Sequence, residues 1–226
     1  MLIIDSLHSV FDRKTGACRC GDSNWEVIED DAGASFIRLT FHKEGGSFGV
    51  IANDFYKSLS AVTNDRSSFL LDKDCDGVSF YEDGDVDKLL FVDLKSSFSE
   101  SSIDKAYKQN FFTFLKLHMM LSLCEGYKLE SLKIEFFAAC PPCKTQDEFD
   151  SIKDNILMAE ETGDDRFINK CLKSYFYDAN NVYSCKVGKI PYVKGKKLHE
   201  NILSTDVTFR IFTPEHLRDS EGILEL

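Results

Sequence analysis

The sequence predicts a mixed α/β fold in which a mixed central sheet is flanked by helices. Three observations lead to this expectation: two apolar strands folded into a hairpin at about residues 70 to 98, a long apolar helix after them, and a further strand at residues 132 to 139. A strand that follows a hairpin through a helix indicates a crossover connection, which is right-handed in nearly all sheets. Helices packed on such a sheet form a layered α/β structure.

Length and composition support one globular domain with an appendage. The chain has 226 residues, of which 43% are hydrophobic and only four are proline, so it can bury a substantial core. We expect an α/β domain over residues 1–180 and a C-terminal extension over residues 181–226 that packs on the same domain.

Charge and apolar runs bear on location and partners. No stretch approaches the roughly 20 apolar residues that cross a bilayer, and the start, Met1 to Asp5, lacks the pattern of an export signal. We therefore expect a cytoplasmic chain without a membrane partner, with its eight cysteines mostly buried and reduced. The formal net charge of −11 argues against non-specific adhesion to nucleic acid.

The first third of the chain predicts β structure followed by a short helix. Residues 35 to 41 alternate between apolar and polar side chains, as a half-buried strand does. From residue 48 to residue 62, Ile51, Phe55, Leu59 and Val62 recur every three or four positions, which favours an amphipathic helix.

The hairpin brings acidic side chains and a lysine together. Its turn, residues 82 to 87, contains Asp-Gly, so the two strands should pair antiparallel. Side chains alternate along a strand, which places Asp93 and Lys95 on one face and Leu90, Val92 and Leu94 on the other. Either Asp74 or Asp76 then lies across from Asp93.

The helix after the hairpin should be central and buried. Ser101 and Asp104 have the spacing of a capping box, and the apolar segment continues through Glu125 and ends at Gly126. Apolar residues surround this helix on nearly all sides, so we expect it to pack between the sheet and other elements.

The rest of the chain predicts further helices and a strand. Helices are expected at about residues 146 to 159 and 165 to 175, a short helix near His199, and a strand at residues 207 to 212. A lysine-rich stretch is the best candidate for a nucleic-acid contact on so acidic a chain. It contains Lys189, Lys194, Lys196 and Lys197.

The order of these motifs resembles the PD-(D/E)xK nuclease superfamily, whose fold is restriction-endonuclease-like. The resemblance covers roughly residues 48 to 140 and rests on Asp76-Gly77, a turn, Asp93-Leu94-Lys95, and a helix bearing Gln109. It implies that Asp76 and Asp93 bind Mg²⁺, for which Mn²⁺ may substitute. It also implies that Lys95 positions the attacking water and that Gln109 supports the site. Asp74 competes with Asp76 for the first ligand position, and Asp54 is the candidate for an additional acid on the preceding helix.

The resemblance implies a metal-dependent endonuclease that hydrolyses phosphodiester bonds, with DNA favoured as the substrate. Such an enzyme would act with a protein partner or as a homo-oligomer, for example as the effector subunit of a defence or restriction system. The alternative is a non-catalytic binding or assembly subunit with the same fold.

Two cysteine pairs offer competing chemistry. Cys140 and Cys143 have the C-x-x-C spacing of a redox pair or of half a zinc site, and Cys18 and Cys20 could supply the other half. Reduced core thiols remain the favoured interpretation, and no cysteine is expected at the catalytic site.

Overall fold

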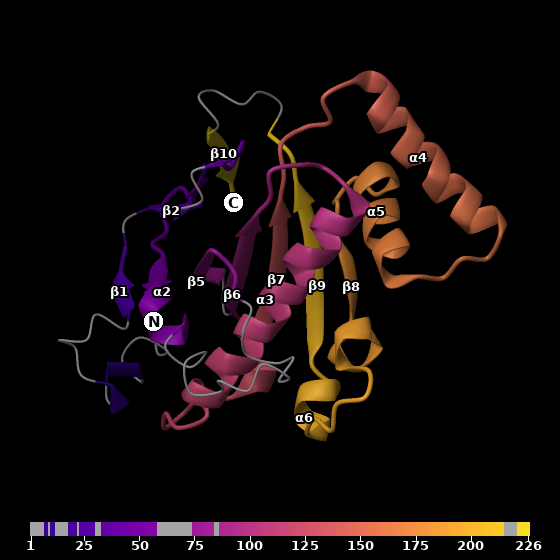
Figure 1. Ribbon diagram of the computed structural model, residues 1–226. Helices are drawn as coiled ribbons and strands as arrows, with labels where there is room; N and C mark the ends of the chain where they lie inside the picture. Colours follow the sequence, from indigo (N-terminus) through magenta and orange to yellow (C-terminus); the bar gives the residue numbers. More distant parts are fainter. Residues whose placement is uncertain are drawn as a thin grey trace.

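A computed structural model describes residues 7–8, 10–11, 18–21, 23–29, 33–57, 74–83, 86–214 and 221–226. Over these residues the chain is a mixed α/β structure with two sheets (Figure 1). The larger sheet is mixed, with β6, β7 and β9 parallel to one another and the outer pairs antiparallel. Its seven strands lie in the order β1 (Cys18–Cys20), β4 (Gly49–Ile51), β5 (Gly77–Asp83), β6 (Val86–Leu94), β7 (Leu132–Ala139), β9 (Asp206–Phe212) and β8 (Tyr183–Lys186).

A three-stranded sheet packs on one face of the larger sheet. It consists of β10 (Glu221–Glu225), β3 (Arg38–His42) and β2 (Asn24–Ile28), with β10 parallel and β2 antiparallel to β3. Trp25 and Phe41 of the small sheet share a buried apolar cluster with Leu90 and Val92 of β6. Because burial of such apolar surface is the main favourable term in folding, this cluster joins the two sheets.

Helices cover the opposite face of the larger sheet (Figure 1). The long helix α3 (Glu100–Leu121) and the shorter α5 (Phe167–Tyr177) bury apolar side chains against β6, β7 and β9. By contrast, α4 (Gln146–Glu161) buries only Ile156. Other helices in the described part include α2 (Asn53–Lys57), α6 (Glu200–Leu203) and the 3-10 turns Leu129–Ser131, Val187–Lys189 and Pro191–Val193.

The central helix is confirmed, but its start differs from the predicted one. Ser99 is the N-cap: its backbone is extended, and its side-chain oxygen accepts a hydrogen bond from the Ser102 backbone N–H at 3.2 Å. Ser101 therefore lies inside the first turn. The helix also ends at Leu121, before a turn that reaches Gly126, whose φ of +81° is readily adopted by glycine. In the part of the chain that the structure describes, no helix has the length and apolarity required to cross a bilayer.

Other predicted elements agree with the structure to different extents. The strand at residues 132 to 139 is β7, and the helices predicted at about residues 146 and 165 are α4 and α5. The helix expected at residues 48 to 62 is wrong in its first part, where residues 49 to 51 form β4 beside β5, and the helix begins at Asn53. Residues 58 to 62 lie outside the described part.

The segment expected as an extension contributes to the main sheet. Strand β9 hydrogen-bonds to β7, and β8 hydrogen-bonds to β9 on its other side. Val207, Phe209 and Ile211 of β9 are buried in the same core cluster as α3. The core therefore runs across the boundary expected near residue 180.

Candidate active site

Asp76 and Asp93 lie across from each other where β5 begins and β6 ends. The register pairs Gly77 with Val92, and the Asp76 backbone N–H donates to the Val92 carbonyl at 3.0 Å. Directly opposed residues of antiparallel strands project to the same face, so the two carboxyl groups share one face. The alternation predicted for β6 is confirmed, because Leu90, Val92 and Leu94 belong to the cluster against the small sheet and Phe91 to the cluster under α3.

Lys95 completes the group at the end of β6. Its backbone N–H donates to the Ala139 carbonyl of β7 at 2.8 Å, which fixes the strand end. Its ammonium group forms an ion pair with Asp93 Oδ2 and donates to Gln109 Oε1 at 3.2 Å. Asp93 is fully buried and the Lys95 side chain is 11% exposed, so this pair lies largely out of water.

Gln109 links the two sides of the site. While Oε1 accepts from Lys95, its Nε2 donates to the Asp74 carbonyl at 2.7 Å. One amide on α3 thus holds both the end of β6 and the segment that leads into β5. The structure therefore brings together the four residues that the sequence analysis named as catalytic: Asp76, Asp93, Lys95 and Gln109.

The choice between Asp74 and Asp76 is decided by α3. The Asp74 carboxylate forms an ion pair with Lys116, a lysine whose side chain is completely buried. The Asp76 carboxylate instead accepts a hydrogen bond from the Leu94 backbone N–H at 2.6 Å, beside Asp93. Asp76 is accordingly the acid that faces Asp93.

Burial disfavours the ionised form of both acids and so raises their pKa values. Removal from water raises the pKa of Asp76 to about 6, although the Leu94 N–H counteracts this, and the charge of Glu29 raises it further. Burial, followed by the charge of Asp76, raises the pKa of Asp93 well above its usual value, while Lys95 lowers it. A positive charge between the two carboxyl groups would relieve both effects.

The surroundings of Asp76 include a residue pair that the sequence analysis missed. Asn53 of α2 donates to the Asp76 carbonyl at 3.0 Å, and the buried Tyr56 donates to Asn53 Oδ1 at 2.7 Å. Asp54, the candidate for an additional acid, is exposed on the other side of this short helix. On its outer side Asp76 lines a cavity of about 430 Å³ together with Trp25, Glu26 and Asn53.

The donor atoms suit Mg²⁺ better than zinc. Neither oxygen of Asp93 accepts a hydrogen bond of regular geometry from the described residues, although Oδ2 contacts Lys95. Among those residues no group of three or more His, Cys, Asp or Glu side chains is arranged for a metal ion. Mg²⁺ commonly uses one or two carboxylates and completes its shell with water and substrate phosphate. Asp76 and Asp93 supply the two carboxylates that such a site requires.

The lysine segment begins at the end of the sheet opposite the acids and then runs along α3, where the Tyr192 hydroxyl donates to the Asp104 carboxylate at 2.8 Å. Lys186, at the end of β8, pairs with Asp206 at the start of β9, and the lysine segment follows it. Asp93 is level with Ile211 near the other end of β9, about 16 Å away for five residues at 3.3 Å each. Lys189, Lys194 and Lys197 are exposed there, and Lys196 lies 5.7 Å from the centre of the Phe112 ring.

The cysteine pairs do not meet. Strands β4, β5 and β6 separate β1, which holds Cys18, from β7, which ends just before Cys140, a span of about 19 Å across four strand spacings. A zinc ion joining the two pairs is therefore ruled out. Burial raises the pKa of the Cys140 thiol to about 12 and also raises that of Cys143, the opposite of what a redox nucleophile needs.

One sequence pattern would have revealed more of the site. Gln109, Thr113 and Lys116 follow each other at helical spacing and form a polar stripe on an otherwise apolar helix. In the structure Thr113 accepts from the Cys75 backbone N–H at 2.9 Å, so the three side chains together hold residues 74 and 75. The buried Lys116 was missed because lysines are rarely found inside a core without a partner.

Fold and site together define a mixed α/β protein with a buried pair of acids and a lysine at a strand end. Comparison of the chain with protein-family models, with curated proteins and with solved structures finds no match. The geometry of the residues is consequently the basis of the functional conclusion.

Proposed function

We propose that this protein is a Mg²⁺-dependent nuclease of the PD-(D/E)xK type, with a restriction-endonuclease-like core and DNA as the favoured substrate. The observation that supports it best is the Asp93 carboxylate. It is completely buried, it lies against the Lys95 ammonium group, and Asp76 is directly across the hairpin. A structural ion pair would not need a second acid that raises the pKa of the first.

Each residue has a role that its contacts allow. Asp76 and Asp93 would hold the metal ion, which when bound lowers the pKa of a water molecule and neutralises charge on the phosphate. Lys95 would orient the attacking water, because its ammonium group is held beside Asp93 by contacts to Asp93, to Gln109 and to the Leu94 carbonyl at 3.3 Å. Gln109 would keep the lysine aligned with the Asp76 segment, and correct alignment is worth orders of magnitude in rate.

Lys95→Ala tests the proposal directly. We expect wild-type protein with Mg²⁺ or Mn²⁺ to nick plasmid DNA or cut single strands, and Lys95→Ala to lose at least about a hundredfold in rate, as the loss of a group that positions the reacting water does. Lys133→Ala is the matched control, since Lys133 is exposed on the neighbouring strand β7. Equal cleavage by Lys95→Ala and wild type would refute the assignment, as would the absence of metal-dependent cleavage by wild type on every substrate.

A second candidate is a non-catalytic subunit with the same fold, in a defence or restriction assembly. Two observations favour it: the lysine segment begins at the end of the sheet opposite the acids, and the net charge is −11. Neither supplies a basic surface at the acids themselves. This candidate requires a partner that supplies the cations for nucleic acid. It predicts that purified wild type binds Mg²⁺ weakly and cuts nothing, while adding the partner restores no activity that depends on Lys95.

A further inference from the structure

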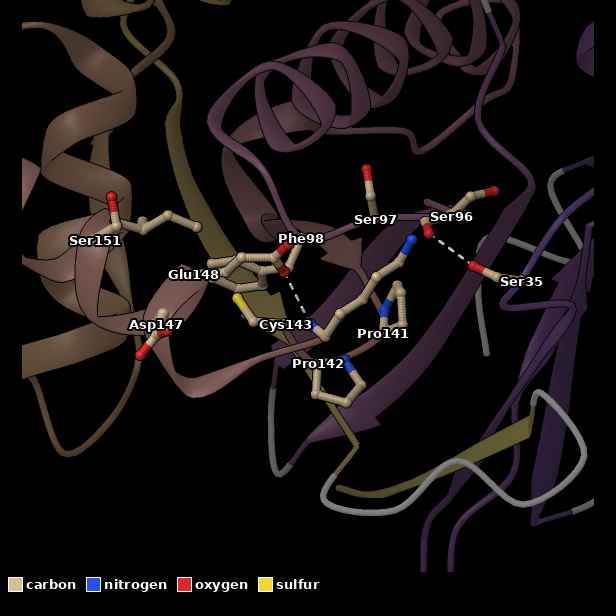
Figure 2. A pocket seen from close by; sticks show the side chains of 12 residues that line it. Ser35, Ser96, Ser97, Phe98, Pro141, Pro142, Cys143, Asp147, Glu148 and Ser151 are labelled. Carbon is tan, nitrogen blue, oxygen red and sulfur yellow. Dashed lines mark hydrogen bonds between the residues drawn. The ribbon is translucent and has the colours of Figure 1, made fainter.

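An open cleft adjoins the candidate site at the same edge of the sheet (Figure 2). Its volume is about 800 Å³, within the range of small-ligand pockets. Ser96 and Ser97, which line it, follow Lys95 directly in the chain, and Pro141 and Pro142 follow the end of β7, whose Ala139 carbonyl binds the Lys95 N–H. We call this hollow the serine cleft.

Three separate parts of the chain form its walls. Figure 2 shows Ser151 and Asp147 on the α4 side, Ser35 and Ser96 on the opposite side, and Phe98 between them. Ser35 donates to the Ser96 carbonyl at 2.6 Å, which ties the loop before β3 to the strand end that bears Lys95. The serine cleft is thus held in position by the same elements that position the candidate catalytic residues.

The lining favours a flat, hydrogen-bonding ligand over a phosphate group. Phe98, Pro142 and Ile152 supply apolar surface, and serine hydroxyls lie beside them. Two carboxylates and one ammonium group line the cleft, those of Asp147, Glu148 and Lys144, so the local charge is negative and disfavours an anion. A nucleobase satisfies these conditions, because its faces stack on apolar side chains and its exocyclic amino group donates to carboxylates.

We propose that the serine cleft binds one unpaired nucleobase of the strand being cut, adjacent to the phosphate at Lys95, and prefers bases with an exocyclic amino group. This inference rests on the proposed function. A base inside a duplex cannot enter such a cleft, since it would have to leave its stack first. The substrate is therefore single-stranded or locally unpaired nucleic acid.

Binding of a fluorescent single strand tests the inference without any cleavage. The probe is a short oligonucleotide with one 2-aminopurine, an amino-bearing base whose emission falls when it stacks, titrated in the presence of EDTA. We expect quenching by wild type, and at least about tenfold weaker binding by Ser151→Trp, which fills the cleft from an exposed helical position. Ser101→Trp, another exposed helical serine outside the cleft, should bind like wild type.

A second variant keeps the shape of the cleft and removes its charge. In the double substitution Asp147→Asn with Glu148→Gln, the amide oxygen at position 148 can still accept from the Lys144 backbone N–H, as the carboxylate does at 3.1 Å. The strands compared carry cytosine or thymine in place of 2-aminopurine. We expect wild type to bind the cytosine strand roughly tenfold more tightly than the thymine strand, and the double variant to bind both about equally. Equal binding of cytosine and thymine strands by wild type, or unchanged binding by Ser151→Trp, overturns the inference.

The outcome separates this inference from the proposed nuclease. Base binding that Ser151→Trp abolishes, in a wild-type protein that cuts nothing, supports the cleft as a base site and removes the hydrolase. Metal-dependent cleavage that Lys95→Ala abolishes but Ser151→Trp leaves unchanged, with the same products, supports the hydrolase and overturns the base site.

Discussion

At the scale of single residues, Asp93 is the most informative position. A carboxylate removed from water ordinarily becomes neutral or acquires partners, and Asp93 has the Lys95 ammonium group on one side and Asp76 on the other. Proteins keep such an unfavourable arrangement mainly at functional sites. The buried pair of Asp74 and Lys116 has a structural explanation instead. Lys116 binds the Asp74 carboxylate and Gln109 binds the Asp74 carbonyl, so both contacts fix the chain before β5.

The raised pKa of Asp76 predicts how stability depends on pH in metal-free protein. The folded carboxyl has a pKa of about 6, above the ordinary value of 3.8. Between these values the folded state retains a proton that the unfolded state releases, so the free energy of unfolding should fall as the pH rises from about 4 to about 6. The loss is up to about 3 kcal/mol, at roughly 1.4 kcal/mol per pKa unit.

Chemical unfolding in EDTA at a series of pH values measures this slope. Asp76→Asn should reduce the slope, leaving the part that the buried Asp93 contributes, and millimolar Mg²⁺ should flatten the wild-type profile by favouring the ionised acids. Asp154→Asn, on the exposed surface of α4, should retain the full slope. An Asp76→Asn profile that coincides with the wild-type profile would contradict the assignment.

At the scale of elements, the site depends on how closely the two sheets approach. Gly77, the first residue of β5, lies under the small sheet: a Cβ added there would be 2.8 Å from Val27 Cγ2 and 2.9 Å from Trp25 Cζ2. Such contacts are too short to tolerate without movement. Glycine at this position therefore allows β2 to cover the start of the strand that Asp76 precedes.

Gly77→Ala should destabilise the protein by about 1–3 kcal/mol, as overpacking a core does. Urea unfolding of Gly77→Ala, Val27→Ala and the double variant measures the coupling between the two positions. Because Val27→Ala removes the contact with Val27 but leaves the one with Trp25, the double variant should lose less stability than the sum of the two single losses. Strict additivity would show that the contact with Val27 is not the cause.

At the scale of the whole molecule, the candidate acids and the start of the lysine segment lie at opposite ends of the large sheet. The acids and the serine cleft lie where β6 and β7 end, whereas the lysine segment starts at the other end of β9 and then runs along α3. On a chain with a net charge of −11, a nucleic acid bound as proposed at the acids would gain most of its electrostatic attraction from the lysine segment rather than at the acids.

This separation predicts a dependence on substrate length. Lys189→Ala with Lys194→Ala and Lys197→Ala should weaken binding of a strand of about 30 nucleotides roughly tenfold and reduce its dependence on salt by about two units of slope, at about 0.7 per phosphate contact. A strand of about four nucleotides should bind unchanged. Affinity titrations at several salt concentrations measure both.

The matched control replaces two lysines that already have acidic partners. Lys170 and Lys173 on α5 form ion pairs with Asp165 and Glu160, so Lys170→Ala with Lys173→Ala should leave binding of the long strand nearly unchanged. The same affinity in the triple variant and in wild type would remove the lysine segment from the interaction.

Local patterns predicted most of the main elements and the composition of the candidate site. The alternation along β6, the Asp-Gly turn and the apolar run of α3 each depend on neighbours within a few residues, so they placed Asp93 and Lys95 on one face and Gln109 on the following helix. The predicted cap at Ser101 was wrong: the capping-box spacing pointed to Ser101 with Asp104, whereas Ser99, followed three positions later by Ser102, is the cap, and only the backbone conformation shows this. Short strands such as β1, β4 and β8 have too few residues for a pattern.

By itself, the amino-acid sequence determined which side chains alternate, where the longest helix runs, and that two acids and a lysine gather at the end of a hairpin, since these follow from local periodicity. Only the tertiary structure decided that Asp76 faces Asp93 while Asp74 pairs with the buried Lys116. It also decided that the cysteine pairs lie apart, that β9 and β8 complete the sheet, and that the lysine segment runs along α3. The physical reason is that long-range pairing is set by packing between segments distant in the chain, which no local pattern encodes.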